Sequence, residues 1–496
     1  MNRLPCFPST LRRRRIAQRL RAGAALLSAM TLSACVGFSD DGGMSIVADV
    51  AGSPLEKDVL AIRTLDDAAS ARARVELLLS RALTADSTVQ IALLANRSLQ
   101  AAYNALGSAE AAMVNAVLPP NPSFSISRIA GPLKLELEAI IAADILALAT
   151  LPARAEIAAD RFHRAQLRAA EETLRLAARA RKDYYRAVAA QELVASLDKA
   201  NSTAESAAQL ARALGETGAM NKLDQAREQV FYADLAAQLA KARQRAIAER
   251  EQLIRSLGLW GDNLDFKLPG SLPAPPSRPK SMPMVEQEAV ARRPDLFVEG
   301  IELDALAKSC GLVEATRFVN VFQLSGVYKD TREIVTRVSS DGTIDTERVR
   351  FRVFGPGATI EIPIFDFGEA RTREAEQNYM QAFNRLVAKA VDVRSEARLA
   401  YQTYRSTWDV ANHYQREILP LRKIITDESL RRYNAMLIDV FPLLAEVRQR
   451  IMANIAAIEA KRDFWLADAD LRAAVIGGVE TRVEETSVSR MDATSQ

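Results

Sequence analysis

Histidine, cysteine and aromatic residues are all scarce in this sequence of 496 residues. It contains 2 histidines and 3 cysteines, and aromatic side chains make up 6% of it. His163 and His413 are far apart and have no cluster of ligand-type residues around them, so no metal site and no other cofactor is expected. The sequence also lacks a Ser/His/Asp arrangement and a phosphate-binding loop, which argues against an enzyme. Few aromatics and abundant alanine favour long helices in close lateral contact.

An excess of one charge and a long apolar run are missing as well. The net charge is +3, from 65 basic and 62 acidic residues, and no basic stripe is interleaved with aromatics, so nucleic acid is not an expected partner. A membrane-spanning helix needs about 18 consecutive apolar residues. In the mature chain the nearest candidate, residues 139–151, is interrupted by Asp144. A membrane crossing would therefore have to use strands closed into a barrel.

The N-terminus carries a targeting signal. Arginines crowd positions 12–21, an apolar run covers positions 22–30, and Leu32-Ser33-Ala34-Cys35 follows. This order is typical of a secretory signal peptide, and its ending resembles a bacterial lipobox, which implies cleavage before Cys35 and acylation of that residue. An ordinary signal with a chance cysteine is the alternative. Val36 stands where an aspartate would indicate retention at the inner membrane, so the outer membrane is the expected destination.

The order of elements repeats along the chain. In each half, two alternating strand segments, four strands in all, lead into a helix several times the usual length. In the first half the expected strands are 123–128 and 133–138, and the long helix is 152–214. In the second half the expected strands are 319–328 and 348–353, the latter leading into 359–364, and the long helix is 369–433. In the first half the long helix would span about 93 Å and the two shorter helices together about 100 Å. In the second half the corresponding lengths are about 98 Å and about 93 Å, so in each half two short helices end to end match one long helix.

These patterns divide the chain into six parts. The predicted parts are a signal peptide 1–34, a lipid-anchored N-terminal tether 35–64, a first repeat 65–260, a proline-rich linker 261–283, a second repeat 284–476 and a disordered tail 477–496. Because about eight strands is the lower limit for a membrane barrel, four strands cannot close one. The chain must therefore share one barrel with copies of itself.

Short motifs in both halves carry a resemblance to a known family. The first-repeat signature of the TolC and OprM outer-membrane efflux proteins resembles two segments here, Leu93-Leu94-Ala95-Asn96-Arg97-Ser98-Leu99 and Leu118-Pro119-Pro120-Asn121-Pro122. Their second-repeat signature resembles Arg293-Pro294-Asp295-Leu296 and Ile362-Pro363-Ile364-Phe365-Asp366-Phe367-Gly368. The resemblance covers the chain from the first predicted helix to the predicted tail.

The resemblance implies a mainly α-helical fold with a small β-barrel, in a two-repeat TolC-like architecture. Long helices would form a periplasmic α-barrel, and four strands from each of three subunits would form a twelve-stranded barrel in the outer membrane of a Gram-negative bacterium. The implied function is a passive conduit that exports solutes delivered by an inner-membrane pump and a periplasmic adaptor protein. Expected partners are two further copies of the chain, the adaptor, the pump and outer-membrane lipid.

The far ends of the long helices are the expected docking and gating region. The candidates there are Gly215, Gly218, Asp224, Met436 and Asp439. In the second half the resemblance departs from the family pattern, because aligning Arg432-Tyr433 with the family's Arg-Tyr places Met436 at the family's glycine and Ala445 at its pore-narrowing aspartate. Asp439 is the nearest acid, shifted by about two turns, and is the gate candidate.

Three arginines are candidates for lining the conduit. Arg348, Arg350 and Arg352 alternate with apolar residues, so they share one face of a strand. In lipid they would have to point into an aqueous lumen, because a charge facing lipid costs about 2–4 kcal/mol near the midplane. An extracellular ribbon above the bilayer is the other hypothesis, and the sequence favours neither.

A different class of protein fits part of the pattern. A lipid-anchored periplasmic coiled-coil protein, such as an adaptor or an envelope scaffold, would also carry long helices and a lipid anchor. An adaptor would have a single helical hairpin flanking a lipoyl-like β-domain. This chain has two predicted hairpins, each preceded by alternating strands, which favours the channel.

Overall fold

The computed structural model describes residues 37–338, 342 and 344–479. The predicted signal peptide 1–34, the lipid attachment at Cys35 and most of the predicted tail lie outside these residues. The chain forms two compact units. The first consists of Met1–Gly42, Gly107–Phe162 and Asp304–Met380, and the second of Gly43–Leu106, His163–Leu303 and Gln381–Gln496.

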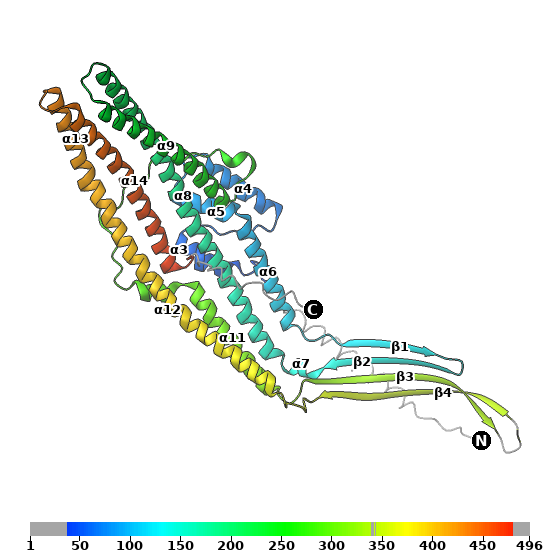
Figure 1. Cartoon of the computed structure of the whole chain (residues 1–496). Coiled ribbons are helices and arrows are strands. Elements are labelled where there is room, and N and C mark those ends of the chain that lie inside the picture. The colour runs from blue at the N-terminus through cyan, green and yellow to red at the C-terminus, as the bar shows by residue number, and fades with distance from the viewer. Residues whose placement is uncertain (1–36, 339–341, 343, 480–496) are drawn as a thin grey trace, which may run out of the picture. The chain divides into compact units, whose positions relative to one another are not determined.

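The first unit contains a four-stranded antiparallel sheet (Figure 1). Its strands, in the order β1-β2-β3-β4, are β1 (Ser123–Ala130), β2 (Lys134–Asp144), β3 (Val321–Val338) and β4 (Ile344–Glu361). The four predicted strands are confirmed, two from each half of the sequence. Strands β1 and β4 each leave one edge of the sheet without a partner strand in the described part of the chain.

Strand β4 differs from the prediction in its extent. Residues 348–353 and 359–364 are predicted as segments separated by Gly355-Pro356-Gly357, but they belong to one continuous strand. Pro356 lies opposite Gly326 on an edge strand, where a residue without an N–H can be accommodated. The proline and its glycine neighbours therefore do not make a turn.

The end of β4 is also earlier than predicted. The strand ends at Glu361, so Ile362 and Ile364 lie in the turn that follows and not in the strand. Within this turn the Asp366 carboxylate accepts a hydrogen bond from the backbone N–H of Gly368 (3.0 Å), just before helix α12 begins. This hydrogen bond helps to hold the turn that leads from the sheet into α12.

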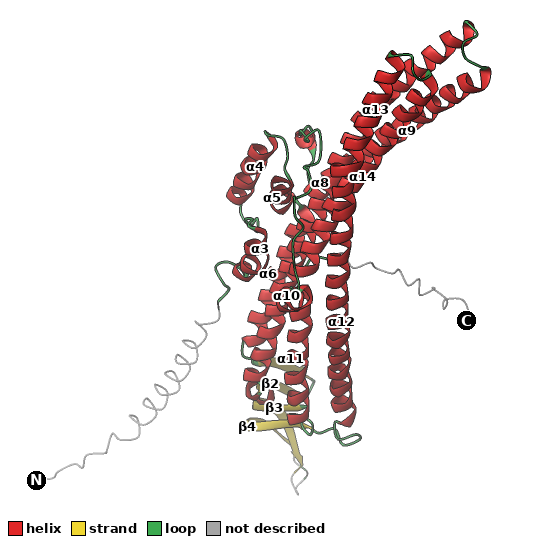
Figure 2. Ribbon diagram, turned by 90° about the vertical axis from the view of Figure 1, so that its left-hand side faces the viewer, coloured by secondary structure: helices red, strands yellow, loops and turns green. Residues whose placement is uncertain are grey.

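The second unit contains two helical hairpins (Figure 2). One consists of α8 (Leu151–Glu216) and α9 (Lys222–Leu257), and the other of α13 (Leu419–Asn434) and α14 (Val440–Ile476). None of the described helices combines the length with the apolar character that crossing a membrane requires.

The predicted helix 369–433 is not uniformly α-helical. Helix α12 (Glu369–His413) passes into a π-helical turn, η4 (Tyr414–Ile418), before α13 begins. Pro420 lacks an N–H and its ring crowds the carbonyl four residues earlier, so a widened turn just before it relieves both conflicts.

Small residues and a few aromatics hold the helices of the second unit together. Between α12 and α14, the rings of Tyr404 and Phe464 are fully buried with centroids 5.5 Å apart. A second buried cluster joins α8, α9 and α14 through Leu197, Leu235 and Ile451. The expectation of closely packed long helices is confirmed.

Further shorter helices belong to the two repeats. They are α4 (Leu65–Leu79), α5 (Ala85–Ala95) and α6 (Arg97–Val117) in the first half, and α10 (Val285–Arg292) and α11 (Pro294–Ala315) in the second. Helix α5 is capped by Thr84, whose hydroxyl accepts from the N–H of Ser87 (3.1 Å) while the Ser87 hydroxyl bonds back to the Thr84 N–H (2.8 Å). This capping box fixes where the helix starts.

The segment predicted as a tether, 35–64, is folded over its described part. Residues Met44–Val47, Ala48–Gly52 and Ser53–Leu55 form consecutive helical turns with Val47 and Ala51 buried. The chain then runs along α5 and α6, where Gln90 binds both the N–H and the carbonyl of Asp58, and Gln100 binds the N–H of Ile62 and the carbonyl of Leu60. Side-chain amides that pair backbone groups in this way anchor the segment, which corrects the tether prediction.

The proline-rich linker is fastened to the helices of its own unit. We call residues 265–283 the strap. Trp465 and Trp408 donate their indole N–H groups to strap carbonyls, at Pro273 (2.9 Å) and Pro276 (2.8 Å). Tyr404 accepts a hydrogen bond from the backbone N–H of Lys280 (3.1 Å). The strap is therefore a fixed structural element of the second unit.

Candidate functional sites

The turn between α8 and α9 is built around Gly218. Its φ of +76° is left-handed, a conformation that favours glycine, and its N–H donates to the Gly215 carbonyl (3.1 Å). Asn221 caps α9 by accepting from the N–H of Asp224 (2.9 Å), and the Asp224 carboxylate pairs with Arg227 (2.9 Å). The structure thus brings the predicted Gly215, Gly218 and Asp224 together at one helical tip.

The turn between α13 and α14 has the same kind of backbone around a different residue. Met436 has a φ of +59°, and its N–H donates to the Tyr433 carbonyl (2.9 Å). The N–H of Leu437 donates to the Arg432 carbonyl (2.8 Å), which completes the Schellman pair of hydrogen bonds. Glycine is the usual residue at the left-handed position, so this backbone supports aligning Met436 with a glycine. A side chain there costs about 1–2 kcal/mol.

Exposed apolar side chains lie at the two tips, together with an exposed aspartate. Met436 is 93% exposed, Leu437 73% and Leu223 61%. Asp439 is exposed at the N-cap position of α14 and makes no side-chain capping hydrogen bond. Apolar side chains that project into solvent beside a charge are typical of a contact surface.

Beneath the turns the two hairpins pack on each other. A small buried cluster joins them, made of Ala211, Met220, Val440 and Leu444. Further along, Glu228 of α9 is 3% exposed and is paired with Arg448 of α14, whose guanidinium also lies 5.2 Å from the ring centroid of Phe231. Sequence reasoning missed this pair, since no local signal connects residues of the two different repeats.

One face of the sheet, called here the apolar face, carries successive rows of apolar side chains. Residues paired across antiparallel strands share a face, so the register defines the rows. In order along the strands the rows are Phe322 and Ile360; Ala143, Leu324 and Ala358; Phe124, Ile141, Gly326 and Pro356; and Ile126, Ala139, Tyr328 and Phe354. Most of the large side chains in them are exposed and Phe322 is partly buried, as on a surface that meets lipid or another chain.

Toward the β3–β4 turn the same face becomes charged. The next rows are Arg128, Leu137, Asp330 and Arg352; Ala130, Leu135, Arg332 and Arg350; and Ile334 and Arg348. Asp330 is 7% exposed and is paired with Arg350, while Nε of Arg352 is 3.7 Å and Nε of Arg332 is 4.0 Å from its carboxylate.

The register confirms that Arg348, Arg350 and Arg352 share one face, but that face is the apolar one. If the apolar face meets lipid, the three arginines point away from the lumen; the lumen hypothesis stays a prediction, and it requires this face to line the conduit. Period two along β3 puts Asp330 and Arg332 on one face of that strand, and the register places them beside the arginines of β4.

The opposite face of the sheet carries more polar residues than the apolar face, although Ile140 and Val327 also lie on it. Its rows include Ser123, Ser125, Ser127, Gln323, Ser325 and Thr359. Glu136 on this face is 7% exposed and is held by Lys134 (2.7 Å) and by Lys329. The two faces therefore differ in the way that a lipid-facing and a water-facing surface differ.

The first-repeat motif marks a break between α5 and α6. Asn96 leaves helical geometry, with φ −70° and ψ 116°. Its side-chain carbonyl accepts from the N–H of Ser98 (2.9 Å) and of Leu99 (3.2 Å), and its amide donates to the Ser256 carbonyl (3.0 Å). A Cβ at Gly258 would lie 2.7 Å from the Cα of Asn96, so the close approach requires glycine there.

The second-repeat motif marks the equivalent break between α10 and α11. Arg293 is 1% exposed, and it donates to the Asp295 carboxylate from Nε (3.0 Å) and Nη2 (2.5 Å) and to Glu396 from Nη1 (2.5 Å). Lys389 adds a contact of 2.8 Å to Asp295. Burial acts to raise the pKa of the Asp295 carboxyl, but Arg293 and Lys389 outweigh it and hold that pKa below its ordinary value.

The residues just after α14 belong to this break and not to a free tail. Gly477 and Gly478 are buried with φ of +104° and +92°. A Cβ at Gly477 would lie 2.8 Å from Cδ of Pro294. The predicted tail therefore begins too early, since Gly477 and Gly478 are packed.

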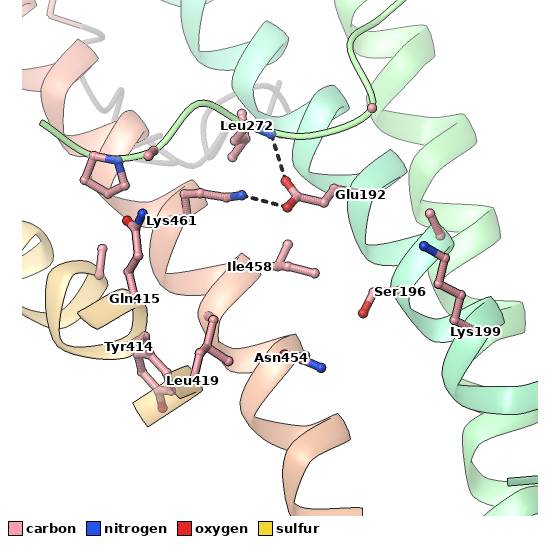
Figure 3. A pocket seen from close by; sticks show the side chains of 16 residues that line it. Glu192, Ser196, Lys199, Leu272, Tyr414, Gln415, Leu419, Asn454, Ile458 and Lys461 are labelled. Atoms are coloured by element: carbon pink, nitrogen blue, oxygen red, sulfur yellow. Dashed lines mark hydrogen bonds and ion pairs between the residues drawn. The ribbon is translucent and has the colours of Figure 1, made fainter. Parts of the chain in front are cut away.

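A cavity of about 500 Å³ lies between α8, α14, the π-helical turn and the strap (Figure 3). Both carboxylate oxygens of Glu192 are engaged, one by Nζ of Lys461 (2.6 Å) and the other by the backbone N–H of Leu272 (2.8 Å). Glu192 therefore joins α8 to α14 and to the strap at the edge of this cavity.

The two histidines and the cysteine have ordinary surroundings. Nδ1 of His163 lies 3.3 Å from the amide oxygen of Gln166, and Nδ1 of His413 lies 3.1 Å from the Glu417 carboxylate. Cys310 is a free, partly buried thiol on α11. Within residues 37–338, 342 and 344–479 no group of three or more histidine, cysteine or acidic side chains is arranged to hold a metal ion.

Comparison with known proteins gives matches by structure only. No family model matches the sequence, and no curated protein matches it. The outer-membrane channel OprN matches with a TM-score of 0.64 and 20% identity, over 85% of this chain and 98% of that one. CusC matches with a TM-score of 0.64 and 16% identity, over 82% of this chain and 92% of that one. The open state of the MtrE outer-membrane channel of Neisseria gonorrhoeae matches with a TM-score of 0.63 and 17% identity, over 82% of this chain and 89% of that one.

These likenesses show the fold. The chain has the two-repeat architecture of TolC-like outer-membrane channels, mainly helical with a small antiparallel sheet of four strands. The fold expected from the sequence motifs is confirmed.

Proposed function

We propose that the chain is the outer-membrane channel component of a tripartite export system. Three copies complete one barrel and one helical tunnel, and solutes delivered by an inner-membrane pump and a periplasmic adaptor pass through it passively. The observation that carries this proposal is the sheet, which has an apolar face backed by a polar one and two open edges. The fold of outer-membrane channels sets the context.

The open edges of the sheet call for further copies. In lipid every backbone N–H and carbonyl must be paired, so an edge strand such as β4, with 18 residues, needs a partner. Four strands are fewer than the roughly eight that a membrane barrel needs. Joining β4 of one copy to β1 of the next satisfies both edges at once.

Helix α12 carries an unpartnered apolar stripe that fits the same assembly. Phe383, Val387 and Val391 are 43%, 48% and 62% exposed. Their spacing puts them on one side of the helix, as in helix–helix packing. The occupant we propose for this stripe is a neighbouring copy of the chain.

The helical tips and the N-terminus complete the proposal. The exposed Leu223, Met436 and Leu437 are the surface offered to the adaptor, and Asp439 with Asp224 are the charges beside the passage. Acylation of Cys35 anchors the chain to the outer membrane of a Gram-negative bacterium. A few residues further on, the N–H of Ser39 donates to the Glu110 carboxylate (2.6 Å), which ties the start of the described chain to α6.

The test uses the purified full-length protein in detergent. We expect an oligomer band in denaturing electrophoresis that becomes monomer only after boiling, together with stepwise ion conductance in planar bilayers. A lipid-anchored scaffold or adaptor would run as a monomer with or without heating and would not conduct, which would overturn the proposal.

A matched pair of variants sharpens the test. Val387→Asp with Val391→Asp places two charges in the proposed interface and should abolish the oligomer band. Gln381→Asp with Ala388→Asp introduces the same two charges at other exposed positions of α12 and should leave it intact. Equal loss in both variants, or in neither, would show that the stripe is not the interface.

A further inference from the structure

The charged end of the apolar face is not explained by a passive conduit. Five arginines gather there on one face against a single acid, Asp330; they are Arg128, Arg332, Arg348, Arg350 and Arg352. We call these five residues the arginine collar. Positive charge on the outer surface of a membrane sheet does nothing for a solute that moves along the opposite, polar face.

Internal pairing leaves most of the positive charge of the collar available. Asp330 is paired with Arg350, and its carboxylate is 3.7 Å from Arg352 and 4.0 Å from Arg332. One carboxylate thus serves three guanidinium groups, whose side chains stay 41%, 58% and 56% exposed for Arg350, Arg352 and Arg332. Arg128 and Arg348 add two further exposed cations in neighbouring rows.

The order of rows along the apolar face matches the layers of a membrane leaflet. Apolar rows come first, then the row with the aromatic rings of Tyr328 and Phe354, and directly after it the first collar row with Arg352. Aromatic side chains are enriched where hydrocarbon meets head groups, and basic side chains bind the anionic groups beyond. The sequence of chemistry along β3 and β4 therefore places the collar at head-group depth.

We propose that the arginine collar binds the phosphate groups of phosphorylated lipids in the leaflet nearest the β3–β4 turn. Guanidinium groups bind phosphate through two parallel N–H···O bonds, and several of them side by side suit a lipid with more than one phosphate. Asp330 holds Arg350 in place between its neighbours. This inference rests on the proposed function, because it requires the apolar face to meet lipid.

The test measures lipid retention by the full-length protein in detergent. Binding of diphosphoryl lipid A is followed by native mass spectrometry as the lipid concentration is raised. Arg348→Gln with Arg352→Gln removes two collar cations and keeps the Arg350–Asp330 pair. We expect its affinity to fall about tenfold or more, given what two cations contribute at an anionic surface.

The control removes the same charge from the other face. Lys134 and Arg337 are exposed on the polar face, and Lys329 still holds Glu136 when Lys134 is changed. Lys134→Gln with Arg337→Gln should leave the affinity for the lipid unchanged. Equal loss in both variants, no loss in the collar variant, or competition by inorganic phosphate at the same phosphate concentration would overturn the proposal.

Conductance separates this inference from the proposed function. If the wild-type protein forms no channel in planar bilayers, the proposed function fails. If it conducts and the collar variant shifts ion selectivity more than the control does, the arginines face the lumen and the collar proposal fails alone. Unchanged conductance with weakened lipid binding is the result that we expect.

Discussion

The two repeats break a helix at the same place with different chemistry. At Asn96 the backbone has φ −70° and ψ 116°, and at Arg293 it has φ −74° and ψ 120°. The first break is held by a neutral amide that caps the next helix, the second by a buried guanidinium that pairs with the Asp295 and Glu396 carboxylates. A glycine from a distant helix end packs behind each one, Gly258 behind the first and Gly477 behind the second. The repeat therefore preserves a backbone conformation and a close contact, while the side-chain chemistry has diverged.

The helical tips show the same divergence. Gly218 and Met436 occupy left-handed positions of corresponding turns, with φ of +76° and +59°. Glycine adopts this conformation without strain and methionine does not. The second tip thus carries strain together with an exposed apolar side chain, which fits a surface that contacts a partner.

The largest expected effect comes from the charged break. Arg293→Ala leaves Asp295 buried without its main partner, so the free energy of unfolding should fall by about 3–5 kcal/mol. Chemical unfolding followed by circular dichroism measures it. Arg292→Ala is the control, since its side chain is 59% exposed and should change stability by less than about 1 kcal/mol. Similar values for both variants would show that the Arg293 cluster is not what holds the break.

Disrupting the neutral break at Asn96 should lower the free energy of unfolding by less than disrupting the charged break at Arg293. Asn96→Ala removes the cap of α6 and leaves the Ser256 carbonyl unpaired, for a loss of about 2 kcal/mol. Asn96→Asp keeps the capping oxygen and loses only the donor, so it should recover part of that loss. If Asn96→Ala costs as much as Arg293→Ala, the contrast between neutral and charged breaks does not hold.

Exchanging residues at the tips should give changes of opposite sign. Met436→Gly relieves the left-handed strain and should stabilise the protein by about 1 kcal/mol, while Gly218→Ala should destabilise it by about 1 kcal/mol. Hydrogen exchange of the amides in the two turns reports both changes locally. A destabilising Met436→Gly would mean that the methionine side chain makes a contact worth more than the strain.

Of the two breaks, only the one at Arg293, which contains the ionised Asp295, should contribute less to stability at acid pH. The folded-state pKa of Asp295 is lowered, so the unfolded chain binds more protons once the pH falls below about 4, and stability is lost as the pH drops through the folded pKa. The stability difference between wild type and Asp295→Asn should therefore shrink from pH 6 to pH 3. A difference that stays constant over this range would contradict the lowered pKa.

The motifs predicted the fold because each one marks a local backbone event. Helices are expected to continue through Asn96 and Arg293, where the structure has breaks instead, but Gly218 reverses the chain as predicted and period-two alternation identified all four strands. The glycine turn and the strand alternation involve only a few neighbouring residues, so they can be recognised without the rest of the molecule.

What escaped prediction depends on contacts between distant segments. The Glu228–Arg448 pair joins two repeats, and tryptophans from two helices hold the strap in place. The face on which Arg350 lies follows from its pairing with β3, which a single strand cannot reveal. The sequence of β4 showed which residues share a face, and only the sheet showed what else lies there.

The number of chains in the detergent-solubilised particle decides whether the protein assembles as a trimer. Three copies are needed to close the open edges of β1 and β4 and to cover the stripe on α12. Light scattering coupled to size exclusion should therefore give a protein mass of three chains per particle. A single chain per particle, in a preparation that retains its helical circular dichroism, would contradict the account.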